Sequence, residues 1–356
     1  MGENGQRINE ADNAMIDAPL VYVIVVNYNG EKYLKTCLSS IRKQTYPNYK
    51  TIVIDNASTD NSEEYLRQYF PKTTFIQAER NLGFAEGNNL AIKSAIDQKA
   101  DYVFLVNNDT ELESDLVKKL IKTAEHDDSI GIVGPAVFDL KNKKSLQEMG
   151  MTIDKFGYAL ALKSSSDKDC VFFVSGCAMM IKSELILRIG FFDESYFMFV
   201  EDLDLCWRSR LAGYKIIVNE NARIYHASGG SISGGVIKSS SYTTNAQRVF
   251  LREKNTVRTL IKNYDFSNLI KFVPFYVALL FFETIFWSCI LKPDVSKNIF
   301  KAIFWNLKML PDTFRQRAVV QNLRKIKDDE LVTKMLDGYC KLRVFRTVGV
   351  PSFVGN

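Results

Sequence analysis

The chain has 356 residues, of which 46% are hydrophobic and 24% are charged, and this composition excludes wholesale disorder. Its length allows a large buried core and roughly two domains. Lysine and arginine exceed aspartate and glutamate by 46 to 41, and a net charge of +5 is too small to imply a nucleic-acid partner.

Two further features bear on the cellular compartment. The six cysteines form no Cys-x-x-Cys pair, as expected of free thiols in a reducing cytosol. Residues 1–18 are polar and contain no apolar signal-peptide core. We therefore expect a polar N-terminal tail followed by a domain that stays in the cytosol.

Apolar runs alternate with helical patterns through the first part of the chain. The sequence predicts strands at 21–26, 51–55, 73–77, 102–106 and 130–133, and helices near 31–43, 60–69, 86–97 and 113–125. Buried strands that alternate with helices are typical of an α/β protein with a mainly parallel, Rossmann-like sheet and helices on both faces.

Polar residues follow strand after strand, at the point where ligands bind in such sheets. The junctions are Asn27–Gly30, Asp55–Asp60, Glu79–Gly83 and Asn107–Asp109. Turn chemistry alone could place Asn, Asp and Gly there, but four junctions on one edge favour a ligand cleft. The chain has neither a G-x-G-x-x-G nor a P-loop motif, so dinucleotide and P-loop sites lack specific support.

An acidic segment further along the chain has the composition of a catalytic site. Glu201 and Asp202 open a helical pattern, where the helix dipole favours ionised carboxylates. Asp202 is the candidate general base, although capping would also explain it. Glu201 either binds an acceptor or caps the helix. Asp204 precedes Arg208 by four residues, which predicts an ion pair. A predicted strand, made of residues 215–218 and then 222–225, leads to His226.

These segments, taken in order, resemble the inverting family 2 glycosyltransferases of the GT-A fold, in the rhamnosyltransferase-like branch that builds surface polysaccharides and lipid-linked glycans. The matching segments are Val25–Gly30, Ile54–Asp60, Arg80–Asn89, Leu105–Thr110, Ser175–Gly176, Phe191–Glu194, Glu201–Leu205, Ala212–Tyr214 and His226. They extend over residues 20–230.

The resemblance implies a nucleoside-diphosphate sugar as donor. It implies that Asp55 meets the nucleobase and that further residues bind the donor: Asn27, Asn29, Arg80, Asn81, Gly83, Asn107 and Asn108. It also implies a Mg²⁺ or Mn²⁺ site at Asp109, where His226 either joins the metal or touches the diphosphate. The family's Asp-x-Asp motif is here Asn107-Asn108-Asp109, with one carboxylate replaced by an amide. The glycine-rich stretch Gly229–Gly235 is interpreted as a loop that closes over donor phosphates, or as an ordinary linker.

The last third of the chain carries the apolar stretch Phe272–Leu291, interrupted by Glu283 and flanked by lysines on both sides. About 20 such residues can cross a bilayer, but basic charge on both flanks argues against a single crossing. A basic amphipathic pattern follows over residues 297–310. In-plane or re-entrant attachment is favoured, and a true span or a buried, oligomer-forming helix are the alternatives.

Together these expectations divide the chain into a tail (1–18), a GT-A catalytic domain (19–240), a helical membrane-associating or oligomerising region (241–345) and a C-terminal tail (346–356). The expected activity is metal-assisted, inverting sugar transfer to a glycan or polyprenyl-linked acceptor, at the cytoplasmic face of the cell membrane. A catalytically degenerate nucleotide-sugar-binding scaffold and a nucleotidyltransferase are the alternatives, and a homo-oligomer is possible.

Overall fold

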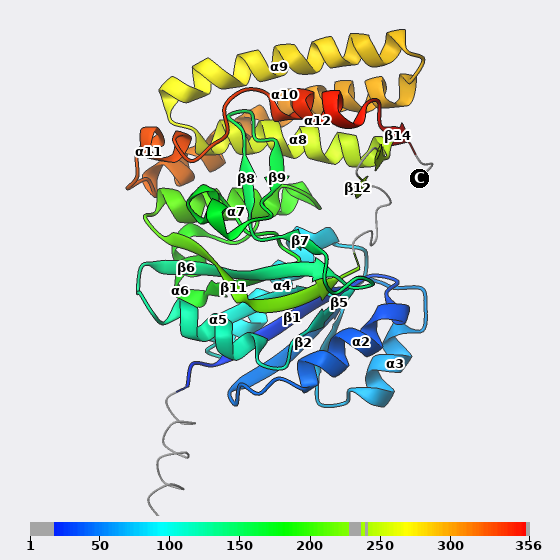
Figure 1. The fold of residues 1–356 in the computed structure, drawn as a ribbon, viewed down its shortest axis with the longest axis vertical. Coiled ribbons are helices and arrows are strands. Elements are labelled where there is room, and N and C mark those ends of the chain that lie inside the picture. The colour runs from blue at the N-terminus through cyan, green and yellow to red at the C-terminus, as the bar shows by residue number, and fades with distance from the viewer. Residues whose placement is uncertain (1–17, 228–235, 239–240, 354–356) are drawn as a thin grey trace, which may run out of the picture.

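The computed structural model describes residues 18–227, 236–238 and 241–353 (Figure 1). Most of the predicted N-terminal tail, the glycine-rich stretch Gly229–Gly235 and the last three residues of the C-terminal tail therefore lie outside the described residues.

The predicted parallel strands form the first half of a nine-stranded sheet. Strands β1 (Val21–Asn27), β2 (Tyr49–Asp55), β3 (Thr74–Gln77) and β4 (Tyr102–Asn107) pair in parallel in the order β3-β2-β1-β4. Apolar runs that are buried on both faces, such as residues 21–25 of β1, produce this arrangement. Because the strands are parallel, their polar carboxyl ends meet at one edge, as predicted.

Beyond β4 the sheet becomes mixed. Strand β10 (Ala178–Lys182) runs antiparallel to both β4 and β6 (Ile130–Asp139). β11 (Lys215–His226) then pairs in parallel with β6. The strand predicted in two stretches, 215–218 and 222–225, is continuous, and its pairing register shifts between Asn219 and Arg223. Two short strands, β5 (Thr110–Leu112) and β7 (Leu146–Glu148), complete the sheet.

Helices cover both faces of the sheet. Apolar side chains of α2 (Glu31–Arg42), α3 (Ser62–Tyr69) and α5 (Leu116–Ala124) form one core cluster with the sheet. Those of α4 (Gly83–Asp97), α6 (Ser183–Ile189) and α7 (Glu201–Leu211) form the other. A hairpin of β8 (Met151–Ile153) and β9 (Ala159–Ala161) and two 3₁₀ turns, Ser165–Cys170 and Glu194–Tyr196, lie between these elements.

The C-terminal helices stack above this α/β unit in Figure 1. They are α8 (Ala246–Asn263), α9 (Phe266–Cys289), α10 (Pro293–Asn322), α11 (Asp328–Val332) and α12 (Cys340–Val348). A small sheet of β12 (Val236–Lys238), β13 (Ser241–Thr244) and β14 (Ser352–Phe353) lies at one end. Helix α8 lies between the α/β unit and the outer pair α9–α10.

One hydrophobic core joins the helical region to the sheet. Phe172 packs edge-to-face on Trp207 at 5.3 Å between ring centroids, and Trp207 on Tyr264 at 4.9 Å. Tyr264 in turn contacts Phe272 of α9 at 5.3 Å. Aromatic contacts of this kind stabilise beyond their buried area. The predicted boundary near residue 240 therefore separates two regions that share one core.

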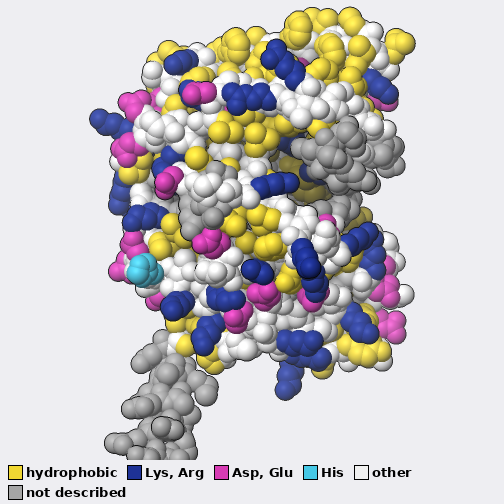
Figure 2. Space-filling view, viewed as in Figure 1, with side chains coloured by type: hydrophobic (Ala, Val, Ile, Leu, Met, Phe, Trp, Pro, Cys, Tyr) yellow, Lys and Arg dark blue, Asp and Glu magenta, His cyan; other side chains and the backbone are white. Residues whose placement is uncertain are grey.

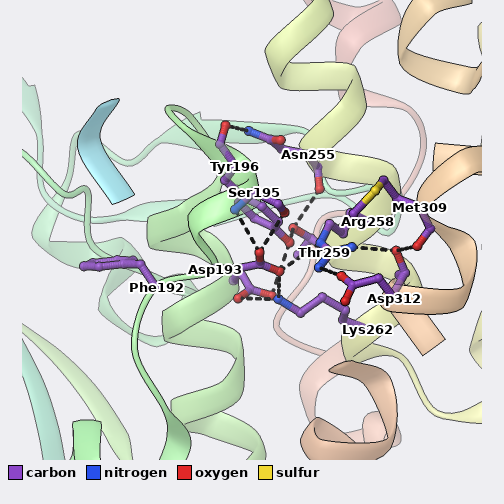
Figure 3. A network of polar contacts seen from close by, with 12 residues as sticks. Phe192, Asp193, Ser195, Tyr196, Asn255, Arg258, Thr259, Lys262, Met309 and Asp312 are labelled. Atoms are coloured by element: carbon purple, nitrogen blue, oxygen red, sulfur yellow. Dashed lines mark hydrogen bonds and ion pairs between the residues drawn. The ribbon is translucent and has the colours of Figure 1, made fainter. Parts of the chain in front are cut away.

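A buried polar network also holds α8 in place (Figure 3). Asp193 accepts hydrogen bonds from Arg258 and Lys262, both at 2.8 Å. Lys262 also reaches Asp204 at 3.0 Å, and Asp204 pairs with Arg208 of its own helix, as predicted. Burial would raise the pKa of Asp193 and Asp204, but these cations outweigh it and lower both values. The network fixes α8 against α7 and against the loop that precedes α7.

Candidate functional site

A cleft of about 530 Å³ opens at the carboxyl ends of the parallel strands. Its walls come from the ends of β1, β4 and β11, the start of α4, the β8–β9 hairpin, the start of α7, and α8. The polar and charged residues that line it include Asn56, Asn81, Asn107, Asn108, Asp109, Glu148, Ser175, Glu201, Asp202, His226, Arg248 and Arg252. Asp109 and Asp202, which lie far apart in the sequence, thus share one cavity.

The two residues assigned to the metal lie side by side. Pairing of β11 with β5 sets His226 opposite Thr110, and His226 Nε2 lies 3.2 Å from Asp109 Oδ1. Burial lowers the pKa of His226, but the hydrogen bond and charge of Asp109, helped by Glu148 and Asp139, raise it above its ordinary value. A carboxylate oxygen and an imidazole nitrogen suit Mn²⁺ better than Mg²⁺.

The described residues contain no group of three or more His, Cys, Asp or Glu side chains arranged to hold a metal ion. The Asp109–His226 pair therefore fits a cation only if a ligand, such as a diphosphate, supplies further oxygens. A diphosphate bound by a cation needs such a partly open protein site.

Asp55 is buried beneath the cleft, with 1% of its surface exposed. Its carboxylate accepts hydrogen bonds from Asn27 at 2.9 Å, from Gln77 at 2.9 Å, and from the backbone and hydroxyl of Ser58 at 2.9 and 2.6 Å. Asn27 Oδ1 in turn accepts from Asn108 at 2.8 Å. Asp55 and Asn27 do not line the cleft; they hold the loops that do, including Asn56.

Asn29 and Arg80 also lie outside the cleft lining. Asn29 has a left-handed backbone (φ 49°), and its Oδ1 accepts from the Thr59 amide at 2.7 Å, which ties two loops together. Arg80 is mostly exposed and pairs with Glu86 at 2.7 Å. Of the eight residues predicted to bind the donor, four line the cleft: Asn81, Gly83, Asn107 and Asn108.

Gly83 is required by its surroundings. Its φ is +72°, and a Cβ there would lie 2.4 Å from the carbonyl oxygen of Phe197. The same carbonyl accepts the backbone amide of Phe84 at 2.6 Å. The start of α4 is thereby joined to the loop that precedes α7.

Asp202 and Glu201 begin α7, which forms another part of the cleft wall. Asp202 Oδ2 accepts the backbone amide of Gly176 at 3.0 Å, and Oδ1 accepts that of Leu203 at 2.8 Å. Burial raises the pKa of Asp202 despite these bonds and the nearby charge of Arg252. Glu201 is 5% exposed, and its Oε2 has no hydrogen-bond partner among the described residues. Burial and the charge of Asp202 raise its pKa well above the ordinary value.

The loop that leads into these acids is strained. Phe197, Phe199 and Val200 all have positive φ, between 65° and 71°. Asn255 of α8 holds this loop by donating to the carbonyls of Tyr196, Met198 and Phe199 at 3.1, 3.0 and 2.6 Å.

The sequence predicted no role for Asn255, because a polar residue on a helix is ordinarily solvated. Glu148 was also missed. Its Oε1 accepts a 2.5 Å hydrogen bond from Ser175, and burial raises its pKa. Helix α8 and strand β7 therefore belong to the site.

Residues 22–187 match the family described as Glycosyl transferase family 2. The matched residues make up just under half of the chain, which is similar to that family over this part. A curated relative, the poly-beta-1,6-N-acetyl-D-glucosamine synthase of Staphylococcus aureus (strain COL), is 27% identical over 194 residues, which are 53% of this chain and 45% of that protein. The chain thus spans about half the length of this relative.

Two solved structures share the fold of this chain. GalNAc-T7 with UDP, GalNAc and Mn²⁺ superimposes with a TM-score of 0.56 at 15% identity, over 70% of this chain and 49% of that one. A mannosyltransferase from Pyrobaculum calidifontis in complex with GDP-Man and Mn²⁺ gives 0.51 at 16% identity, over 85% and 94%. The predicted GT-A fold, with helices flanking a curled mixed sheet and a C-terminal helical region, is confirmed.

Proposed function

We propose that this protein transfers a sugar from a nucleoside-diphosphate sugar to a hydroxyl group of a glycan or lipid-linked saccharide, with inversion at the anomeric carbon. One observation carries the proposal: a single cleft holds the Asp109–His226 pair and, at the start of α7, the half-buried carboxylate of Asp202. Sugar transfer needs both a site that holds the diphosphate and a base that accepts the proton of the acceptor hydroxyl. The similarity of residues 22–187 to glycosyltransferase family 2 supports the donor class.

Asp202 is the proposed general base. It accepts the proton of the acceptor hydroxyl while that oxygen bonds to the anomeric carbon and the bond to the diphosphate breaks. The nucleoside diphosphate leaves with the bonding electrons. A pKa raised by burial makes the carboxylate a stronger base, and its two backbone hydrogen bonds fix its direction. Glu201 is proposed to contact the acceptor.

Asp109 and His226 would hold a Mn²⁺ or Mg²⁺ ion, which would neutralise charge on the diphosphate as it leaves. We assign Asn81, Gly83, Asn107 and Asn108 to direct donor contact. Asn27, Asn29 and Asp55 then act by holding the loops around the donor. Arg80, which is exposed beside the start of α4, would reach the donor only after leaving Glu86. A rhamnosyltransferase-like sugar specificity is the finer part of the proposal.

The test combines Asp202→Asn with a panel of nucleotide sugars and Mn²⁺. The unaltered protein should release free nucleoside diphosphate with one of them. Asp202→Asn should lower turnover by about 10²-fold or more, as expected for loss of a general base, while donor binding stays within twofold. Asp97→Asn, an exposed aspartate on α4, is the matched control. Full turnover in Asp202→Asn would refute the assignment.

Two alternatives give different products. The amide at Asn107 favours a nucleotide-sugar-binding scaffold, which would bind a donor tightly but never consume it. A nucleotidyltransferase would release pyrophosphate rather than a nucleoside diphosphate.

We also propose in-plane attachment to the cytoplasmic face of a membrane. Helix α9 is long and apolar enough to cross a bilayer. An 18-residue stretch of it has a mean hydropathy of 1.9, and 22% of that stretch is buried inside the protein. However, Phe272, Tyr276, Leu280 and Trp287 are buried along one face of α9, while large apolar side chains cover its outer face. Figure 2 shows apolar side chains gathered over this end of the molecule, with basic ones among them.

Helix α9 carries one carboxylate within its apolar stretch, that of Glu283, and this group is paired with other residues of the protein. It accepts hydrogen bonds from Lys341 at 2.6 Å and from Tyr339 at 2.7 Å, both near the start of α12. The carboxylate therefore faces the protein rather than lipid. A crossing helix would carry these ionic partners into the hydrocarbon region, at a cost of several kcal/mol by order of magnitude. An in-plane orientation avoids that cost.

A further inference from the structure

Two arginines on α8, Arg248 and Arg252, line the cleft one helical turn apart. Within the described part of the chain, neither side chain lies within ion-pair distance of a carboxylate. The other cations of this helix are satisfied: Lys254 donates to the Ser195 carbonyl at 2.7 Å, and Arg258 and Lys262 reach Asp193. The contrast singles out the two residues that face the cavity.

Aromatic rings, rather than acids, flank both guanidinium groups. Arg248 lies over the ring of Phe199 at 4.3 Å, and Arg252 over that of Tyr158 at 5.2 Å. The Nε of Arg248 is buried and has no hydrogen-bond partner among the described residues. Burial, and then the charge of Arg252, lowers the pKa of Arg248 to about 10. Burial would also lower the pKa of Arg252, but Tyr242 and Tyr158 raise it, so both side chains are cationic at neutral pH.

Two like charges placed one turn apart repel each other, and a buried donor without a partner costs free energy. An anion bound between them would relieve both costs. Guanidinium groups bind phosphate through paired, charge-assisted hydrogen bonds, and stacking on aromatic rings holds them in one orientation.

The position of Arg252 indicates which phosphate would bind. Arg252, Tyr158 and Tyr242 line the catalytic cleft and also a second, smaller pocket of about 90 Å³. That pocket is mainly apolar and lies among α8, α9, α10 and α12, with Trp287, Val295, Ile299, Phe345 and Phe353 in its walls. The arginines thus lie where a polar cavity meets an apolar one beneath the outer helices.

We propose that Arg248 and Arg252 bind the phosphate or diphosphate of a lipid-linked acceptor, whose first hydrocarbon units enter the apolar pocket. This subsite rests on the proposed sugar transfer, because it places the acceptor beside Asp202. The charge of Arg252 acts on that carboxylate. The diphosphate of the donor offers the same chemistry, but the donor's proposed place is at Asp109 and His226.

The test measures binding of farnesyl diphosphate, inorganic pyrophosphate and farnesol to the full chain by calorimetry, beside UDP, GDP and dTDP with Mn²⁺. The combined change Arg248→Gln and Arg252→Gln should weaken farnesyl diphosphate binding at least tenfold. Binding of farnesol and of whichever nucleotide the unaltered protein takes should change less than twofold. Arg315→Gln, at a side chain that is 77% exposed, should change none of them.

Three outcomes would overturn the subsite: farnesyl diphosphate fails to bind, binds equally well to the altered protein, or keeps its affinity while nucleotide binding is lost. The last result would show that the two arginines bind the donor. If the altered protein does not fold, binding to the unaltered protein still tests the subsite. Because of the apolar pocket, farnesyl diphosphate should bind to it at least tenfold more tightly than pyrophosphate does. If no nucleotide binds while farnesyl diphosphate depends on the arginines, the proposed sugar transfer fails and the subsite stands.

Discussion

Burial and a neighbouring charge act together on the carboxyl group of Glu201. Its Oε2 has no partner among the described residues, and Asp202 adjoins it. Its pKa in the folded protein lies above the ordinary 4.5, so the folded state binds more protons than the unfolded state over that range. The free energy of unfolding must then fall as the pH rises from 4.5 through the raised pKa.

We therefore predict that Glu201→Gln, which removes the charge that burial disfavours, stabilises the protein at pH 8 by about 1–3 kcal/mol, since each pKa unit above the ordinary value corresponds to about 1.4 kcal/mol. The gain should vanish below pH 4.5, where the glutamate is protonated in both states. Urea unfolding at several pH values measures it. Glu184→Gln, at an exposed position on α6, is the control. A gain that is constant with pH would contradict a buried, ionising Glu201.

The role of His226 can be tested with the other histidine as a matched control, because the chain has only two histidines. Removing an imidazole from the pair with Asp109 should weaken Mn²⁺-dependent nucleotide binding about 10–100-fold, the range typical for disturbed metal sites. His126→Ala, at an exposed position after α5, should have no effect. Calorimetric titration of nucleotide with and without Mn²⁺ gives both values. Equal loss without the metal would show that His226 binds the nucleotide itself.

At the scale of elements, the loop over residues 197–200 links the two walls of the cleft. Its positive φ angles store strain of order 1–3 kcal/mol each, and Asn255 supports them with three hydrogen bonds. We predict that Asn255→Ala lowers turnover more than donor binding, because Asp202 then loses its fixed position. It should also destabilise the fold by about 1–3 kcal/mol.

Kinetics and thermal unfolding of Asn255→Ala measure the two effects separately. Asn298→Ala is the matched control, since that side chain bonds a carbonyl of its own helix at an exposed place on α10. Unchanged turnover in a destabilised Asn255→Ala would mean that the loop is only structural.

The strands and helices of the first half were predictable because burial on both faces leaves continuous apolar runs between turn residues. The carboxyl-end junctions therefore located the cleft. The insertion of β10 between β4 and β6 was not predictable, since pairing across 70 residues leaves no local pattern. Nor was α8, whose buried residues include Glu253, Lys254, Asn255 and Arg258. Polar residues that are buried by mutual pairing look solvated in sequence.

The same difficulty explains the donor residues. Asn27 and Asp55 occur at the expected strand ends, yet they bond each other beneath the surface. Sequence gives the end of a strand but not which of two adjacent side chains faces the cavity. Asn56, next to Asp55, is the one that lines it.

At the scale of the whole molecule, α9 and α10 form an apolar outer layer, while α8 below it reaches the cleft. Because the core runs unbroken from the sheet through Tyr264 to Phe272, deleting the helices would unfold rather than solubilise the protein. Surface substitutions are the sharper test of membrane attachment. Phe282, Phe304 and Leu307 are suitable because each is 61–69% exposed.

We predict that changing Phe282, Phe304 and Leu307 together to serine abolishes co-sedimentation with vesicles rich in anionic lipid and leaves the unfolding temperature unchanged, since buried apolar area drives such binding. Replacing Lys297, Lys301 and Lys308 by glutamine should weaken binding only to anionic vesicles, by ~1 kcal/mol per lysine. Leu187→Ser, on α6 and equally exposed, is the control. If the triple serine variant instead turns an oligomer into a monomer, as light scattering would show, the outer layer contacts another copy of the chain and not lipid.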